Sequence, residues 1–133
     1  METAQNKIVK AALLGAGTVG SGVYQLVQER QEDFPHICGT QIQITKILVR
    51  DASKEREGIP SPLLTDNWNE IIEDDSISII IEVMGGIEPA KSYLLEAMKA
   101  GKQVVTANKD LIAEHGHELL DTAEQYGCDF KFE

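Results

Sequence analysis

The stretch Gly15-Ala-Gly-Thr-Val-Gly20 follows the apolar run Ile8–Leu14 and opens a pattern of helical spacing. A strand, a glycine-rich turn and a helix in this order are typical of a loop that binds the pyrophosphate of a dinucleotide. We expect Gly15 to allow the tight turn, Gly17 to let the backbone approach the phosphates, and Gly20 to let helix and strand pack closely. The alternative is a turn that binds nothing. No Gly-Lys-Ser/Thr ending follows, which disfavours a nucleoside-triphosphate loop.

Apolar runs and helical spacings alternate along the rest of the chain. The expected strands are Ile8–Leu14, Ile42–Val49, Leu63-Leu64, Ile77–Val83, Gln103–Thr106 and Cys128–Phe132. The expected helices are Val19–Arg30, a short one with Trp68 and Ile72 capped by Asp66 or Asn67, one from Pro89 to a stop at Gly101, and Asn108–Tyr126 with an interruption near Gly116. This alternation predicts the α/β class, a doubly wound parallel sheet of the Rossmann type in three αβα layers. The expected strand order is 3-2-1-4-5-6, with a ligand crevice at the carboxyl ends where the order reverses.

Three further expectations concern a loop and several side chains outside these motifs. The segment Ala52–Pro62 is charged and carries proline and glycine, so it is expected to be an exposed loop. Trp68 is expected to anchor its short helix to the core. Tyr93 and Met98 share a helical apolar face, which favours core packing over ligand binding.

Length and charge limit the function classes. A chain of 133 residues is expected to form one domain, and its net charge of −10 argues against nucleic acid or an anionic membrane as a partner. No stretch approaches the ~20 apolar residues of a membrane span. Cys38 and Cys128 stand in no paired motif, which predicts free thiols and a cytoplasmic location. His115 and His117 are two residues apart, so a helix would point them differently and no metal site is expected.

The end of the second expected strand bears on the cofactor. NAD-binding domains usually carry an acidic residue there, about 20 residues past the glycines, that binds the ribose 2′-hydroxyl. This chain instead has Arg50, followed by Asp51, with Lys54 and Arg56 close by. A guanidinium can hold a 2′-phosphate in a bidentate fashion, whereas a carboxylate would repel it. Arg50 therefore predicts NADP, helped by Lys54 or Arg56, while NAD held by Asp51 and a solvated charge cluster remain alternatives.

Two further segments, Glu82-Val-Met-Gly-Gly86 and Val105-Thr-Ala-Asn-Lys109, make the pattern specific. Together with Gly15–Gly20 and Val49-Arg-Asp51, they make the chain resemble the N-terminal cofactor domain of homoserine dehydrogenase over essentially all 133 residues. The resemblance implies the reversible reduction of aspartate 4-semialdehyde to homoserine with NAD(P)H. It also implies a role in the biosynthesis of threonine, methionine and isoleucine.

The resemblance also assigns roles to residues of this chain. Lys109 would be the catalytic residue, because a lysine at the crevice can donate a proton to the developing alkoxide or stabilise its charge. A cation is unfavourable at the positive end of a helix dipole, so a lysine there indicates an anionic ligand, the alternative being a solvated lysine. Glu82 could cap or orient the turn at Gly85-Gly86. The expected cofactor-binding residues are Gly15, Ala16, Gly17, Thr18, Val19, Gly20, Arg50, Met84, Gly85, Gly86, Thr106, Ala107, Asn108 and Lys109.

The family pattern continues beyond residue 133. The substrate pocket, further catalytic residues and the contacts of a homodimer are expected in that C-terminal part. Residues 1–133 are thus expected to be an NAD(P)-binding domain that binds dinucleotide and turns over no substrate. One rival is an NAD(H)-sensing regulatory module without catalysis, and Lys109 and the Gly85-Gly86 turn favour the enzyme over it. Another rival is a different semialdehyde or phosphate-ester dehydrogenase of similar fold.

Overall fold

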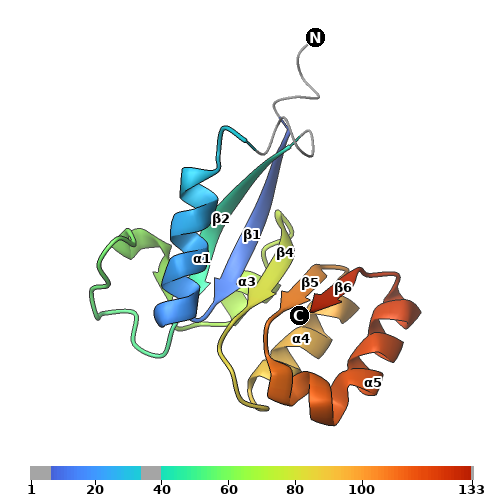
Figure 1. Ribbon diagram of the computed structural model, residues 1–133. Coiled ribbons are helices and arrows are strands. Elements are labelled where there is room, and N and C mark those ends of the chain that lie inside the picture. The colour runs from blue at the N-terminus through green and yellow to red at the C-terminus, as the bar shows by residue number, and fades with distance from the viewer. Residues whose placement is uncertain (1–6, 34–39, 133) are drawn as a thin grey trace.

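The strands form a parallel sheet in the order β3-β2-β1-β4-β5-β6, as the sequence predicted (Figure 1). The computed structural model describes residues 7–33 and 40–132, so the expectation for Cys38 lies outside the described residues. The strands of this sheet are β1 (Ile8–Leu14), β2 (Gln41–Leu48), β3 (Leu64–Thr65), β4 (Ile77–Glu82), β5 (Gln103–Thr106) and β6 (Phe130–Phe132).

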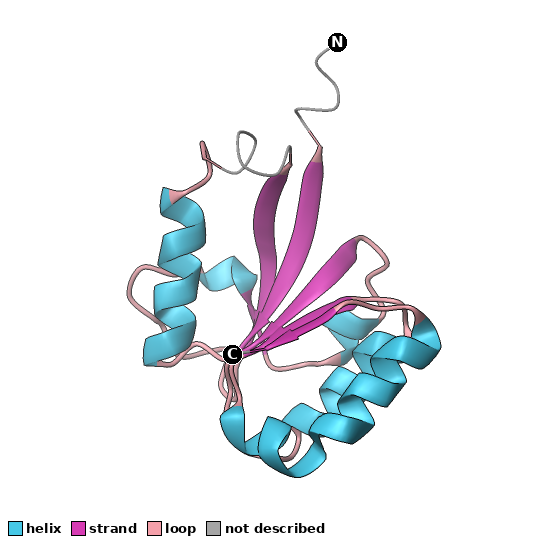
Figure 2. Cartoon of the chain, turned by 45° about the vertical axis from the view of Figure 1, so that its right-hand side comes forward, coloured by secondary structure: helices cyan, strands magenta, loops and turns pink. Residues whose placement is uncertain are grey.

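Helices cover both faces of the sheet (Figure 2). Helix α1 (Thr18–Glu29) lies on one face, and the short α3 (Asn69–Ile72) packs with α4 (Ala90–Lys99) and α5 (Lys109–Tyr126) on the other. A 3-10 turn, η2 (Ser61–Leu63), leads into β3. No helix in the described ranges is both long enough and apolar enough to cross a membrane.

Each face of the sheet has its own hydrophobic core. Leu14 packs in the core under α3, α4 and α5, whereas Leu13 packs in the core under α1. Both side chains are fully buried, because successive residues of a strand point to opposite faces and both faces of β1 are covered. This arrangement explains why β1 reads as an almost continuous apolar run.

Most predicted boundaries agree with the structure to within two residues. The predicted interruption of the last helix is confirmed, since His115 has non-helical dihedral angles next to Gly116. The side chain of Asn67 accepts a hydrogen bond from the Asn69 N–H at 3.0 Å, although the residue at the N-cap position of α3 is Trp68 and not Asp66 or Asn67. The description of Ala52–Pro62 as an exposed loop is wrong at Ile59, which is buried in the core under α1.

Trp68 anchors α3 to the rest of the protein, as predicted. Its ring stacks on that of Tyr93 in α4, with centroids 4.4 Å apart, and its indole N–H donates to Glu96 at 3.0 Å. Tyr93 is half-buried, whereas Met98 on the same helix is fully buried. Packing therefore accounts for Met98 completely and for Tyr93 only in part.

Candidate functional site

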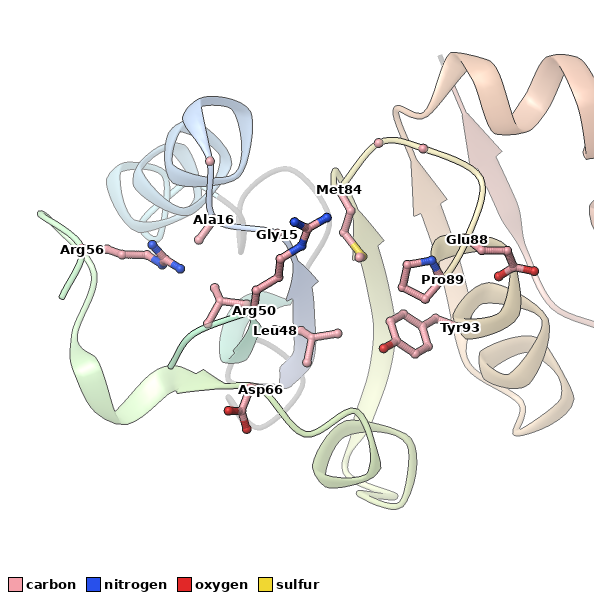
Figure 3. Close-up of a pocket in the computed structure, with 14 residues that line it drawn as sticks. Gly15, Ala16, Leu48, Arg50, Arg56, Asp66, Met84, Glu88, Pro89 and Tyr93 are labelled. Carbon is pink, nitrogen blue, oxygen red and sulfur yellow. The ribbon is translucent and has the colours of Figure 1, made fainter. Parts of the chain in front are cut away.

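A cleft of about 710 Å³ opens at the carboxyl ends of the strands, where the strand order reverses between β1 and β4 (Figure 3). Its walls come from the turns after β1, β2, β3 and β4 and from the start of α4. The predicted site residues that line it are Gly15, Ala16, Gly17, Arg50, Met84, Gly85 and Gly86. The structure thus brings together residues from three separate motifs of the sequence.

The glycine loop is shaped as the sequence analysis expected. Gly15 has a φ of +109°, and a Cβ on Gly20 would lie 2.2 Å from the Gly15 carbonyl oxygen. The turn and the start of α1 can therefore approach each other only without a side chain at position 20. Open space surrounds the position of a Cβ on Gly17, the residue at the entrance of α1.

The turn that leads into α1 lines the cleft with Gly15, Ala16 and Gly17. The helix has no side-chain cap, and the Ser21 N–H donates to the Gly17 carbonyl at 2.8 Å. The N–H groups of the preceding turn have no carbonyl to bind within the helix. Such a turn, at the positive end of the helix dipole, suits an anion such as a pyrophosphate.

Two arginines enter the cleft from the side of β2. Figure 3 shows Arg50 lying toward Gly15 and Met84, while Arg56 points inward from the loop after β2. The Nε atom of Arg56 is buried and has no hydrogen-bond partner in the part of the chain that the structure describes. Lys54, the other predicted helper, is exposed and does not line the cleft.

Asp51, by contrast, is turned toward its own loop. Its Oδ1 accepts hydrogen bonds from the Ser53 hydroxyl at 2.6 Å and from the Ser53 N–H at 3.0 Å. These two bonds hold the pKa of Asp51 below its usual value, with smaller contributions from the charges of Arg56 and Lys54. Asp51 does not line the cleft.

A buried carboxylate stands behind the far wall of the cleft. Glu82 ends β4 and is fully buried. Its Oε2 accepts from the N–H groups of Met84 at 2.9 Å and Gly85 at 3.2 Å, and its Oε1 accepts from the Thr106 hydroxyl. The expected role of Glu82 in orienting the glycine turn is therefore confirmed.

The predicted residues at the start of α5 lie behind that wall. Thr106 and Asn108 are buried, and Asn108 caps α5 by accepting from the Leu111 N–H at 3.1 Å. The Asn108 amide also donates to the Gly86 carbonyl at 2.5 Å. Lys109 is exposed at the first turn of α5 and does not line the cleft.

Six residues that line the cleft were missed by sequence reasoning, namely Leu48, Val49, Asp66, Glu88, Pro89 and Tyr93. The predicted strand order could have identified Leu48, Val49 and Asp66, because they lie at the carboxyl ends of β2 and β3. Tyr93 carried no signal beyond its apolar spacing. Thr18, Val19, Gly20 and Ala107 do not line the cleft, and their assignment to the cofactor stays a prediction. Within the described residues, no group of three or more His, Cys, Asp or Glu could hold a metal ion.

Comparison with known proteins identifies the family to which this chain belongs. The family described as "Homoserine dehydrogenase, NAD binding domain" matches residues 15–133. The chain belongs to this family. It is 45% identical over 128 residues to the homoserine dehydrogenase of Bacillus subtilis, which covers 96% of this chain and 30% of that protein. It is 46% identical over 125 residues to the Corynebacterium glutamicum homoserine dehydrogenase, covering 94% of this chain and 28% of that protein.

Solved structures agree with the family match. A crystal structure of S. aureus homoserine dehydrogenase superposes with a TM-score of 0.90 at 49% identity, over 96% of this chain and 32% of that one. A hyperthermophilic archaeal homoserine dehydrogenase in complex with NADPH gives a TM-score of 0.74 at 25% identity, over 95% of this chain and 44% of that one. The chain thus corresponds to the NAD-binding domain of the family. It spans about 30% of the length of the Bacillus subtilis homoserine dehydrogenase.

Proposed function

We propose that this chain is the cofactor-binding part of an enzyme that interconverts aspartate 4-semialdehyde and homoserine with a nicotinamide cofactor. The observation that carries the proposal is the glycine loop in the cleft of a homoserine dehydrogenase NAD-binding domain. We further propose that the enzyme is cytoplasmic and serves threonine, methionine and isoleucine biosynthesis. The substrate pocket and the homodimer contacts would then belong to the part of the relatives that this chain does not span.

The residues present fit a dinucleotide. The uncapped start of α1 supplies backbone donors for the pyrophosphate. The ribose next to the end of β2 would meet Arg50 and Arg56, while Asp51 is bonded to Ser53 and does not line the cleft. Asp66, at the end of β3, is the carboxylate that lines this side. Arg56 lines the cleft and points inward, and a guanidinium group suits an anion such as a phosphate. These features support NADP over NAD as the preferred cofactor.

We assign to Lys109 the role of a substrate-side cation that acts from outside the cleft formed by these residues. The bound cofactor would supply the hydride, which reduces the aldehyde carbon. Lys109 stands exposed at the first turn of α5, directly after the cap Asn108. There its ammonium group can donate a proton to the oxygen of the reduced carbon or stabilise the negative charge that develops on it.

Kinetics of the longer protein test this assignment. Lys109→Met should lower the kcat of homoserine oxidation by about 10²- to 10⁴-fold, the usual contribution of a positioned proton donor. Lys99→Met is the matched control. Lys99 is exposed at the C-terminal end of α4 and lies outside the cleft. The 133-residue chain alone should bind NADPH and show no homoserine oxidation.

Two outcomes would reject the proposal. Oxidation of homoserine by the 133-residue chain would show that residues 1–133 already hold a complete active site. A longer protein that binds NADPH tightly but turns over no homoserine would instead favour the NAD(H)-sensing module.

A further inference from the structure

Glu82 begins the motif Glu82-Val-Met-Gly-Gly86, but its own side chain does not line the cleft. The fully buried carboxylate of Glu82 receives donors from the turn after β4 and from the end of β5. The Asn108 amide, at the start of α5, lies 3.4 Å from its Oε2. One carboxylate therefore touches three segments of the fold.

These contacts close a ring. Glu82 holds the N–H groups of Met84 and Gly85, and the Asn108 amide holds the carbonyl of Gly86. The Thr106 hydroxyl donates to Glu82 and accepts from the Asn108 N–H at 3.0 Å. Hydrogen bonds from Glu82 and from Asn108 thus join the turn after β4 to the first turn of α5.

Met84 and Ile87 on either side pack against the core, but packing does not fix the two glycines between them. Gly85 and Gly86 have φ angles of +81° and +76°, and a Cβ on either residue would meet no atom within 4 Å. A glycine pair that nothing packs around has a wide choice of conformations. The hydrogen bonds to Glu82 and Asn108 therefore select the conformation that forms the wall of the cleft.

We propose that Glu82 is a positioning residue for the nicotinamide half of the cofactor, fixing the Met84–Gly86 wall relative to α5. This inference rests on the proposed function. In a doubly wound fold each half of the sheet receives one mononucleotide of the dinucleotide. Arg50 and Arg56 belong to the β1–β3 half, whereas the Glu82 ring lies entirely in the β4–β6 half. Loss of the ring should affect only the nicotinamide side.

Two ligands separate the two halves experimentally. NADPH occupies both, whereas 2′,5′-ADP carries only the adenosine, the 2′-phosphate and one 5′-phosphate. In Glu82→Gln the side chain keeps its size, but its amide nitrogen cannot accept the hydrogen bonds that one carboxylate oxygen now accepts. Titration calorimetry on the 133-residue chain should show an NADPH Kd raised about tenfold or more, with the 2′,5′-ADP Kd unchanged within about twofold.

A second variant keeps the test valid if Glu82→Gln does not fold. Asn108→Ser retains an N-cap oxygen for α5 but lacks the amide that reaches the Gly86 carbonyl. It should weaken NADPH and spare 2′,5′-ADP in the same way. A thermal melt by circular dichroism shows which variants are folded at the titration temperature.

The remaining outcomes count against the inference. Equal weakening of both ligands in folded variants would mean that Glu82 only stabilises the domain. Unchanged binding of both ligands would mean that the Met84–Gly86 wall keeps its conformation without the hydrogen bonds of Glu82. If the unmodified chain binds neither ligand, the proposed function itself fails, and that result is distinct from the other two.

Discussion

Gly20 lies against the Gly15 carbonyl so closely that a Cβ on Gly20 would stand 2.2 Å from that oxygen. The contact joins the end of the strand–helix turn to its beginning. It fixes the position of the turn ahead of α1, where Gly15, Ala16 and Gly17 line the cleft. The loop geometry and the anion site therefore depend on one missing side chain.

Gly20→Ala should damage both stability and binding. The new methyl group must push backbone away from backbone, an overpacking that costs about 1–3 kcal/mol of unfolding free energy. The displaced turn should also raise the NADPH Kd at least about tenfold. Urea unfolding and calorimetric titration measure the two effects.

Gly22→Ala is the matched control in the same helix. A Cβ on Gly22 would meet no atom within 4 Å, and the residue is exposed. The substitution should raise the unfolding free energy by about 0.5–1 kcal/mol through helix propensity and leave NADPH binding unchanged. Equal behaviour of the two alanine variants would contradict the role given to Gly20.

The Trp68–Tyr93 stack makes cofactor binding visible. Trp68 is the only tryptophan of the chain, and the ring it stacks on lines the cleft. Reduced nicotinamide absorbs where tryptophan emits, so NADPH should quench the Trp68 emission by energy transfer. NADP⁺ lacks this absorption and should quench far less. Equal quenching by both forms would argue against transfer to a nicotinamide in this cleft.

Much of the fold was predictable from the sequence, because the deciding signals are local. A continuous apolar run such as Ile8–Leu14 marks a strand buried on both faces, and glycines mark the turns where strands meet helices. Right-handed crossovers in a doubly wound sheet then left few alternatives for the strand order. The burial of Ile59 in the core under α1 was not predicted, because a single apolar residue among charged residues shows no periodicity.

The cleft was predictable only in part, because its wall depends on contacts between distant segments. Arg50 and the glycines follow from motif position. The sequence could not show that Ser53 would bind the carboxylate of Asp51, or that Thr106 and Asn108 would turn their side chains toward Glu82. Tyr93 has the spacing of a core residue and also lines the cleft.

Lys102 stabilises the opposite end of the sheet. It is almost fully buried, and its Nζ donates to the carbonyls of Asp74 at 2.8 Å and Ile77 at 2.6 Å. Lys102→Met leaves both acceptors without this donor and should lower the unfolding free energy by about 1–3 kcal/mol. NADPH affinity of the folded variant should not change, since Lys102 does not line the cleft. A loss of affinity in the folded variant would contradict this separation.

The same lysine should make stability depend on pH in alkaline solution. Burial lowers the pKa of Lys102 below its ordinary value of 10.5, and the charges of Asp74 and Asp75 oppose this only in part. The folded state therefore releases the proton at a lower pH than the unfolded state. The unfolding free energy of the unmodified chain, measured relative to Lys102→Met, should rise as pH increases through the folded pKa toward 10.5. A difference that stays flat or falls would contradict the assignment.

The most direct test of the account is the ratio of NADH to NADPH dissociation constants, measured by calorimetric titration of the chain, Arg50→Ala and Lys54→Ala. The unmodified chain should bind NADPH about tenfold or more tighter than NADH, as expected for a charge-assisted contact to the 2′-phosphate. Arg50→Ala should remove most of that preference by weakening NADPH alone. Lys54→Ala removes the same charge outside the cleft and should keep the preference. Equal affinity for the two cofactors, or a preference that survives Arg50→Ala, would contradict the assignment of NADP to this cleft.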